Sequence, residues 1–253
     1  MCTVTLFDGD GAFVLTMNRD ESWQRSPEQP PLLHAGRPPA RSWIGPIDSE
    51  RGGTWVAVNR AGVAACLLNG YAPGDLELLG RDDVPSRGEI IVRAMDNGPR
   101  EAMRWAEAEL DPSPYPSFVL LVWTPTGSRL LRWTIGSGLS IEKVSPGWSM
   151  VTSSYFHAEA AERWRGEAFE AWLASDAPLS HGLPKFNILE DPKARELSPF
   201  MTRTVSATRS VTQIRNRPDS RTFEMRYWRR QGTAMIDPST PDATFELEAQ
   251  PAS

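Results

Sequence analysis

Residues 1–21 read MCTVTLFDGDGAFVLTMNRDE, and this stretch decides the fold. Residues 3–7 are rich in β-forming side chains, and residues 12–17 have the same character. Between them, residues 8–11 read DGDG, which is a strong turn signal because glycine readily adopts positive φ. The stretch therefore predicts an antiparallel β-hairpin whose second strand ends in the polar cluster 18–21.

Cys2 directly follows Met1, and Met aminopeptidases remove Met when the next residue is small. The mature chain would then begin with a cysteine that carries both a thiol and a free α-amine. Thiols titrate near pH ~8.5 and α-amines near ~7.7–8.0, so a nucleophile and its base would share one residue. The alternative is that position 2 simply holds a small residue.

The polar cluster Asn18-Arg19-Asp20-Glu21 follows the second strand of the predicted hairpin. If the strands pair through the turn at 8–11, residue 2 faces residue 17 or 18, and the cluster lies near the thiol. Arg19 would stabilise a thiolate, and Asp20 would hold the α-ammonium through charge-assisted hydrogen bonds. The alternative is a solvated turn with salt bridges.

Further strand pairs and helices follow along the chain, and they predict an α+β fold of two antiparallel sheets between helical layers. We interpret residues 22–53 as a long loop that could form a wall or lid over a site. Residues 1–235 are expected to form a single domain, and 236–253 a loose tail. The expected strands are 54–59, 63–68, 117–123, 129–135, 139–144, 148–153, 201–214 and 222–228, and the expected helices are 86–96, 99–110 and 158–174.

The composition excludes several classes of function. The chain has 253 residues with 27 basic and 32 acidic side chains, and this balance lacks the excess of positive charge that nucleic-acid-binding proteins use. No apolar run reaches the roughly 18–20 residues of a membrane span, and residues 1–8 do not resemble a signal peptide, so we expect a cytoplasmic protein. The two Cys and three His are too dispersed for a zinc site, so no metal or cofactor is expected.

Two residues near the second hairpin have chemical interest. Asn69 ends a predicted strand beside Gly70, where a side-chain amide can donate to a developing oxyanion. The alternative is an Asn-Gly turn without a catalytic role. Cys66 lies in the apolar run 63–68 and is predicted to be an inert core thiol.

Several spaced motifs together resemble the NRDE family, the transport-and-Golgi-organisation-like proteins. The similarity spans roughly residues 1–230 and is densest in the first 70. Its elements are Cys2, Asn18-Arg19-Asp20-Glu21, Arg25-Ser26-Pro27, Gly52-Gly53-Thr54-Trp55, Asn59, Gly62, Leu68-Asn69 and Thr202-Arg203-Thr204.

That family in turn resembles the N-terminal-nucleophile (Ntn) hydrolases, in particular the cholylglycine hydrolase and penicillin V acylase group. The resemblance implies a four-layer αββα fold, a cysteine exposed by Met removal, and hydrolysis of an amide bond without a metal. It also implies that Asp20 holds the α-amine and that Asn69 is the oxyanion donor.

The chain departs from these hydrolases at their arginines. An arginine stands three residues before the aspartate in those enzymes, where this chain has Met17. Because adjacent strand residues face opposite ways, we expect Arg19 to replace it only if the strand end bends. Arg203 is a candidate for their late active-site arginine by position alone, so either Arg19 or Arg203 would supply the positive charge.

Three further residues are predicted to bind substrate. Ser153 ends a strand at the position where the hydrolases carry an asparagine. Asn18 and Glu21 flank the Arg19-Asp20 pair in the polar cluster.

The leading interpretation is an amidohydrolase that cleaves a small N-acyl amide through an acyl-enzyme on Cys2. One alternative is a non-catalytic binding or trafficking protein on the same fold, since members of the resembled family are linked to haem mobilisation and secretory-pathway organisation. A third is a structural domain that retains Cys2 unused. The expected partner is a small amide substrate or an apolar ligand.

Overall fold

The computed structural model describes residues 2–9, 11–78, 81–175, 182–217 and 221–250. The chain divides into two compact units, which we describe separately. Unit 1 comprises 1–26, 146–215 and 225–244, and unit 2 comprises 27–145, 216–224 and 245–253.

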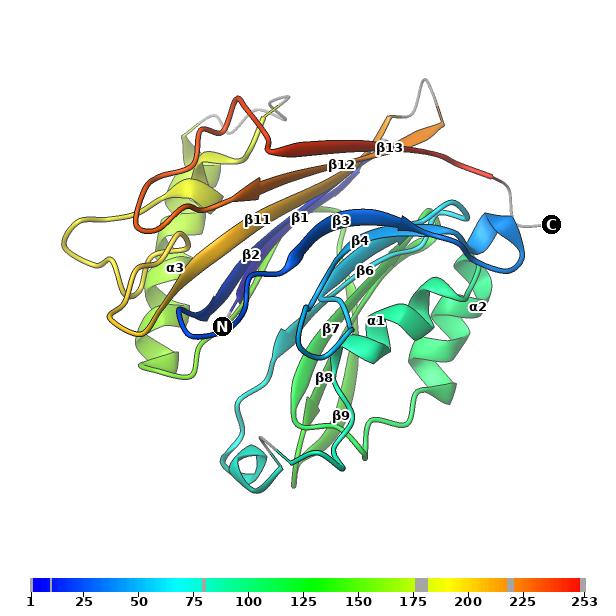
Figure 1. Ribbon diagram of the computed structural model, residues 1–253, viewed down its shortest axis with the longest axis horizontal. Coiled ribbons are helices and arrows are strands. Elements are labelled where there is room, and N and C mark those ends of the chain that lie inside the picture. The colour runs from blue at the N-terminus through cyan, green and yellow to red at the C-terminus, as the bar shows by residue number, and fades with distance from the viewer. Residues whose placement is uncertain (1, 10, 79–80, 176–181, 218–220, 251–253) are drawn as a thin grey trace. The chain divides into compact units, whose positions relative to one another are not determined.

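The predicted N-terminal hairpin is confirmed and forms the centre of a six-stranded sheet with the order β10-β1-β2-β11-β12-β13 (Figure 1). β1 pairs antiparallel with β2 and β10, and β2 pairs antiparallel with β11. β2 is longer than expected because it continues through the polar cluster. The strand bounds are β1 Cys2–Gly9, β2 Ala12–Ser22, β10 Gly147–Ser153, β11 Ser206–Arg217, β12 Thr222–Arg229 and β13 Ala243–Glu248.

Helix α3 (Ala158–Ala174) packs against β10, and the short helix η4 (Lys185–Ile188) packs against α3, β1 and β2. The buried side of α3 is formed by Ala161, Arg165 and Phe169. Their spacing of four residues places them on one stripe of the helix. An arginine in this otherwise apolar stripe is the unusual feature of the layer.

Unit 2 contains a seven-stranded antiparallel meander with the order β3-β4-β5-β6-β7-β8-β9. Helix α1 packs on β5 and β6, and α2 packs on β7 (Figure 1). Their apolar stripes bury side chains such as Ile90 and Ala102 against Leu120. The bounds are β3 Gln29–His34, η1 Pro39–Arg41, β4 Trp43–Ile47, β5 Val56–Asn59, β6 Ala64–Asn69, η2 Pro73–Glu77, α1 Gly88–Met95, α2 Pro99–Arg104, η3 Trp105–Glu109, β7 Phe118–Thr124, β8 Gly127–Thr134 and β9 Gly138–Val144.

The expectation of one long loop over residues 22–53 is wrong. The segment contains β3 and β4, which pair with each other at the edge of the seven-stranded sheet. Pro30 and Pro31 obscured β3 in the sequence, but an edge strand tolerates residues that cannot donate to the ladder. This segment is therefore part of the sheet.

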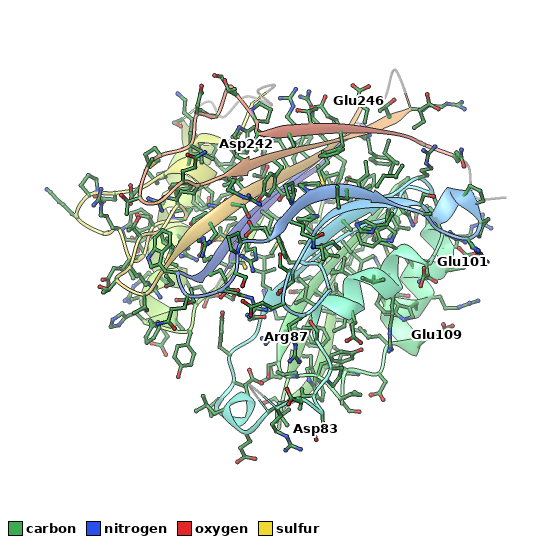
Figure 2. All side chains as sticks on the ribbon, in the orientation of Figure 1. Asp83, Arg87, Glu101, Glu109, Asp242 and Glu246 are labelled. Atoms are coloured by element: carbon green, nitrogen blue, oxygen red, sulfur yellow. The ribbon has the colours of Figure 1, made fainter. Side chains whose placement is uncertain are left out.

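Part of the expected loose tail is also a strand. β13 lies at the edge of the six-stranded sheet, and its Leu247 is buried whereas Glu248 is exposed. Glu246, on the other side of Leu247 in the sequence, is also exposed (Figure 2). This alternation is the pattern of a half-buried strand. That residues 1–235 form a single domain stays a prediction.

The predicted α+β class is confirmed, because each unit combines an antiparallel sheet with helices on it. These are the sheets and helical layers that the αββα prediction requires. In the described ranges, no helix is both long and apolar enough to cross a membrane.

Candidate functional site

Cys2 lies in a row of side chains that crosses neighbouring strands. Its Cα pairs with Arg19 on β2 and with Ser153 on β10. Residues directly opposite each other in a sheet point to the same side. Ser153, Cys2 and Arg19 therefore lie on one face of the sheet, which we call the Cys2 face.

The observed register corrects the expectation that residue 2 faces residue 17 or 18. The two strands pair as far as Gly9 and Ala12, so the turn is centred one residue later than the DGDG segment suggested. This shift moves the partner of Cys2 two residues along β2, from residue 17 to Arg19. The need for a bend at the strand end is likewise wrong, since residues 17 and 19 share a face and Arg19 already points to the cysteine side.

Cys2 is buried, with 7% of its surface exposed. Burial raises the pKa of the Cys2 thiol above its ordinary value, while the N-terminal amine opposes this rise most strongly. The main-chain N–H of Asp20 and the charge of Arg19 also lower the pKa of this thiol. The thiol therefore lies within the electrostatic reach of the amine, of Arg19 and of Asp20.

Asp20 lies on the opposite face of β2, which we call the α3 face. Its carboxylate is buried, and its Oδ1 accepts a hydrogen bond of 2.6 Å from the Thr208 hydroxyl. Its Oδ2 lies 3.7 Å from Nη2 of Arg165. Burial raises the pKa of the Asp20 carboxyl, and the positive charge of Arg165 opposes that rise most strongly. Asp20 is thus held from two elements.

Arg165 contacts Asp20, and the sequence pattern had not singled it out as a candidate. Its side chain is fully buried, and its Nη1 donates to the hydroxyls of Thr3 at 2.9 Å and Thr152 at 2.6 Å. Its Nε and Nη2 donate to the carbonyls of Leu197 and Ser198. The signal was its position between Ala161 and Phe169 on the buried stripe of α3.

The interpretation of the polar cluster as a solvated turn is wrong for its two central residues. Arg19 and Asp20 are buried at 5% and 4% exposure, inside a strand. Asn18 donates both of its amide hydrogens, to the carbonyls of Asn187 at 2.7 Å and Pro199 at 2.8 Å. Because both hydrogens are used, this amide ties β2 to the loop after α3 and has none to donate to a ligand.

Glu21 is partly exposed and lies among positive charges. Its Oε2 is 3.3 Å from Nη2 of Arg19 and 3.7 Å from Nε of Arg25. Its Oε1 accepts a hydrogen bond from the main-chain N–H of Ser22. Arg19, Arg25 and Glu21 therefore have a net charge of +1.

Arg203 belongs to the same unit and is buried, with 8% of its surface exposed. Its Nε and Nη2 donate to the carbonyl of Glu196 at 3.0 and 2.7 Å, and its guanidinium lies 5.6 Å from the ring centre of Phe156. The charge of Arg203 also lowers the pKa of Asp20, though less than that of Arg165. Arg203 therefore anchors a loop while remaining electrostatically coupled to Asp20.

Asn69 belongs to unit 2, where it ends β6. Its Nδ2 donates to the hydroxyl of Tyr71 at 3.3 Å. Its role as an oxyanion donor stays a prediction. Cys66, three residues earlier on this strand, is buried at 0% exposure, as its apolar context predicted.

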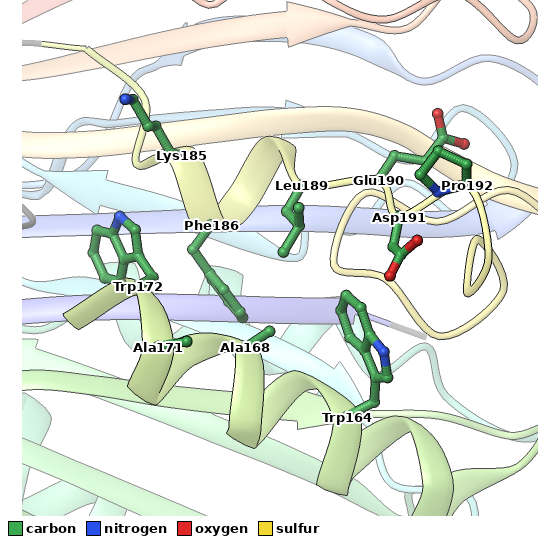
Figure 3. Close-up of a pocket in the computed structure, with 10 residues that line it drawn as sticks. All are labelled: Trp164, Ala168, Ala171, Trp172, Lys185, Phe186, Leu189, Glu190, Asp191 and Pro192. Carbon is green, nitrogen blue, oxygen red and sulfur yellow. The ribbon is translucent and has the colours of Figure 1, made fainter. Parts of the chain in front are cut away.

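Unit 1 also has a pocket of about 540 Å³ between α3 and the segment that follows η4 (Figure 3). Trp164, Trp172, Phe186 and Leu189 supply most of its apolar lining. Lys185, Glu190 and Asp191 add charged groups to its rim. Among the described residues, no cluster of three or more His, Cys, Asp or Glu side chains could hold a metal ion.

A known protein family matches most of this chain. The sequence profile of the family described as Transport and Golgi organisation 2 matches residues 1–229. The chain belongs to this family. The resemblance drawn from Cys2, the NRDE tetrapeptide and the spaced motifs is therefore confirmed.

Solved structures of Ntn hydrolases share the fold. The C2A mutant of conjugated bile acid hydrolase from Clostridium perfringens aligns over 98% of this chain and 92% of its own, with 12% identity and a TM-score of 0.50. The N-acylethanolamine-hydrolyzing acid amidase (NAAA) ortholog from Caenorhabditis elegans aligns over 85% of this chain and 92% of its own, with 9% identity and a TM-score of 0.57. No curated protein matches the sequence. The predicted Ntn-hydrolase-like fold is confirmed.

Proposed function

We propose that this protein is a cysteine amidohydrolase that cleaves a small N-acyl amide through an acyl-enzyme on Cys2. The observation that supports it most is the strand register. It aligns Cys2 with Arg19 and Ser153. Asp20 directly follows Arg19, the partner of Cys2 on β2. Removal of Met1 would create the α-amine at this point of the sheet.

The proposed reaction has two balanced steps. The α-amine takes the thiol proton, and the thiolate sulfur attacks the amide carbonyl carbon. As the C–S bond forms and the C–N bond breaks, the α-ammonium returns the proton to the leaving amine. Water, deprotonated by the same amine, then attacks the thioester carbonyl carbon. As the C–O bond forms and the C–S bond breaks, the α-ammonium returns the proton to the sulfur and the acid is released.

The surrounding residues have distinct proposed roles. Asp20 orients the α-amine, and Arg165 and Thr208 are positioning residues that hold Asp20. Arg19 supplies positive charge beside the sulfur, and its place in the row favours it over Arg203, whose N–H groups anchor a loop. Asn69 is proposed to stabilise the oxyanion.

The Ntn relatives support the class of bond. Their names describe hydrolysis of conjugated bile acids and of N-acylethanolamines, and the first was solved with its residue 2 changed from Cys to Ala. We propose the same type of bond for this chain and leave its acyl and amine halves to experiment. We also propose a cytoplasmic location, which the two free cysteines favour.

The test is a panel of N-acyl amino acids and acyl amides, assayed with wild type, Cys2→Ala and Cys66→Ala. We expect wild type and Cys66→Ala to hydrolyse at least one member, and Cys2→Ala to lose that activity by roughly 10³-fold or more. Intact mass of the same wild-type sample should show Met1 removed. Retained Met1, or hydrolysis that survives Cys2→Ala, would overturn the proposal.

The pocket beside α3 favours one second candidate, the binding of a small apolar molecule. Its volume lies within the usual range for ligand sites, and two tryptophans line it. Such a ligand would quench the fluorescence of Trp164 and Trp172. If quenching by apolar probes is unchanged in Ala168→Trp, which would fill the pocket, this candidate is excluded.

A further inference from the structure

The row through Cys2 extends to a fourth strand. Arg19 pairs with Cys2 on one side and with Ser210 of β11 on the other. Ser153, Cys2, Arg19 and Ser210 thus cross β10, β1, β2 and β11 in order on the Cys2 face. Neighbouring strands are about 4.8 Å apart, so the row spans roughly 14 Å.

A β-bulge places Ser210 in this row. The register shifts between Thr208, which pairs with Asp20, and Ser210, which pairs with Arg19. Without the bulge, residues 208 and 210 would share a face. With it, Thr208 reaches Asp20 on the α3 face while Ser210 joins the Cys2 face.

The two hydroxyls in the row are buried and unpaired. The Oγ atoms of Ser153 and Ser210 have no hydrogen-bond partner among the described residues, and Ser210 is only 1% exposed. An unpaired buried hydroxyl costs free energy, so native proteins contain few of them, and each needs a physical explanation. Their alignment with a nucleophile candidate points to a ligand as that explanation.

The charge of the row favours an anionic ligand. Arg19 lies between Cys2 and Ser210, and Glu21 is shared by Arg19 and Arg25, so the three charged groups have a net charge of +1. A guanidinium and a hydroxyl both donate hydrogen bonds, and oxygen anions accept them. A carboxylate is a small group that matches both donors.

We propose that the Cys2 face binds its substrate across the strands, with a substrate carboxylate held by Arg19 and Ser210 close to the carbon that the Cys2 sulfur attacks. Ser153 lies on the opposite side of the sulfur from Arg19 and contacts the uncharged end of the substrate. The proposal rests on the proposed function in taking Cys2 as a nucleophile, and it names carboxylate-bearing amides as the substrate class.

Two alkylating reagents test the site without any need for turnover. The thiolate of Cys2 displaces iodide from iodoacetate or iodoacetamide, forming the same C–S bond, so the reagents differ only in carboxylate against amide. Rates are measured by mass spectrometry of the N-terminal peptide, with a free cysteine peptide as reference and buried Cys66 as internal control. We expect the iodoacetate-to-iodoacetamide rate ratio at Cys2 to exceed that of the reference by about tenfold, the effect of one charge-assisted hydrogen bond.

Three variants locate the effect. Arg19→Gln and Ser210→Ala should each lower the ratio towards the reference value. Thr212→Val is the matched control, because it removes another unpaired hydroxyl from the same face, two residues further along β11, and should not change the ratio. If Arg19→Gln fails to fold, the comparison of Ser210→Ala with Thr212→Val decides.

The outcomes separate this inference from the proposed function. A wild-type ratio equal to the reference, or a raised ratio that Ser210→Ala does not change, overturns the carboxylate site. A raised ratio that depends on Ser210, without Cys2-dependent hydrolysis of any amide, supports the carboxylate site and overturns the hydrolase. Cys2-dependent hydrolysis together with a wild-type rate ratio equal to the reference supports the hydrolase and overturns the carboxylate site.

Discussion

The two faces of the sheet around β1 treat their buried hydroxyls differently. On the α3 face, Thr208 donates to Asp20, and the hydroxyls of Thr3 and Thr152 accept from Arg165. On the Cys2 face, Ser210 and Thr212 are equally buried, yet their hydroxyls have no partner within the described ranges. On one face the hydroxyls take part in a network of hydrogen bonds and an ion pair around Arg165 and Asp20, and the other presents unpaired donors beside a cysteine.

This difference suggests a division of labour across one layer of strands. The network around Arg165 fixes the position of Asp20 and makes the α3 face important for stability. Unpaired hydroxyls lower stability, and binding sites are where such a cost is commonly retained. Substitutions on the α3 face should therefore affect folding, and substitutions on the Cys2 face should affect chemistry.

The largest expected effect is that of Arg165→Met. The substitution leaves the Asp20 carboxylate buried without its ion pair, so we expect the free energy of unfolding to fall by about 3–5 kcal/mol. Denaturant unfolding measures it, with Arg163→Met on the exposed side of α3 as the control, expected to change stability by about 0.5 kcal/mol or less. Equal losses in the two variants would contradict the central place of Arg165.

Thr208→Val should have an intermediate effect. It removes the hydroxyl that donates to Asp20 Oδ1 and leaves a buried carboxylate oxygen without this partner. We expect the free energy of unfolding to fall by about 1–3 kcal/mol in the same experiment. A neutral result would mean that the hydrogen bond from Thr208 to Asp20 does not stabilise the α3 face.

The pH dependence of Cys2 alkylation probes the other face. Burial raises the pKa of Cys2, so the rate should rise with pH around a midpoint above that of an ordinary thiol in chains that retain Met1. The charge of Arg19 lowers the pKa of Cys2, so Arg19→Gln should move the midpoint to higher pH. A midpoint that is unchanged or lower in Arg19→Gln would show that the Arg19 charge does not act on the sulfur.

Thr212→Val should have the smallest effect and sharpens the comparison most. It is the same substitution as Thr208→Val, on the same strand and at the same 0% exposure, but it removes an unpaired hydroxyl. We expect the free energy of unfolding to stay the same or to increase by up to about 1 kcal/mol. A loss as large as that of Thr208→Val would mean that the two faces do not differ.

The sequence predicted the elements with strong local signals. The DGDG turn between two β-rich runs predicted the hairpin, and helix 158–174 matched its observed bounds. Motifs at several positions predicted the family and the fold. Strand β3 was missed because two prolines hide an edge strand, and β13 was missed because its alternation is short and largely acidic.

The site was only partly predictable, because its geometry depends on long-range pairing. Cys2 and Asp20 were identified from local pattern, but the pairing of Cys2 with Arg19 depends on the residue at which the turn is centred. The role of Ser210 depends on a β-bulge in β11, and Ser210 lies about 190 residues after its partner Arg19 in the sequence. No local pattern predicts such a pairing. Arg165 contacts Thr3 across 162 residues, so only its place in an apolar helical stripe hinted at it.

The most direct test of the role of Cys2 is the mass of the N-terminal peptide after the protein is mixed briefly with an amide that it hydrolyses. An acyl-enzyme on Cys2 predicts a peptide that begins with Cys2 and carries the acyl group as a thioester, which hydroxylamine removes and which is absent in Cys2→Ala. A peptide that still begins with Met1, or an acyl group that persists in Cys2→Ala, would contradict the central role of Cys2.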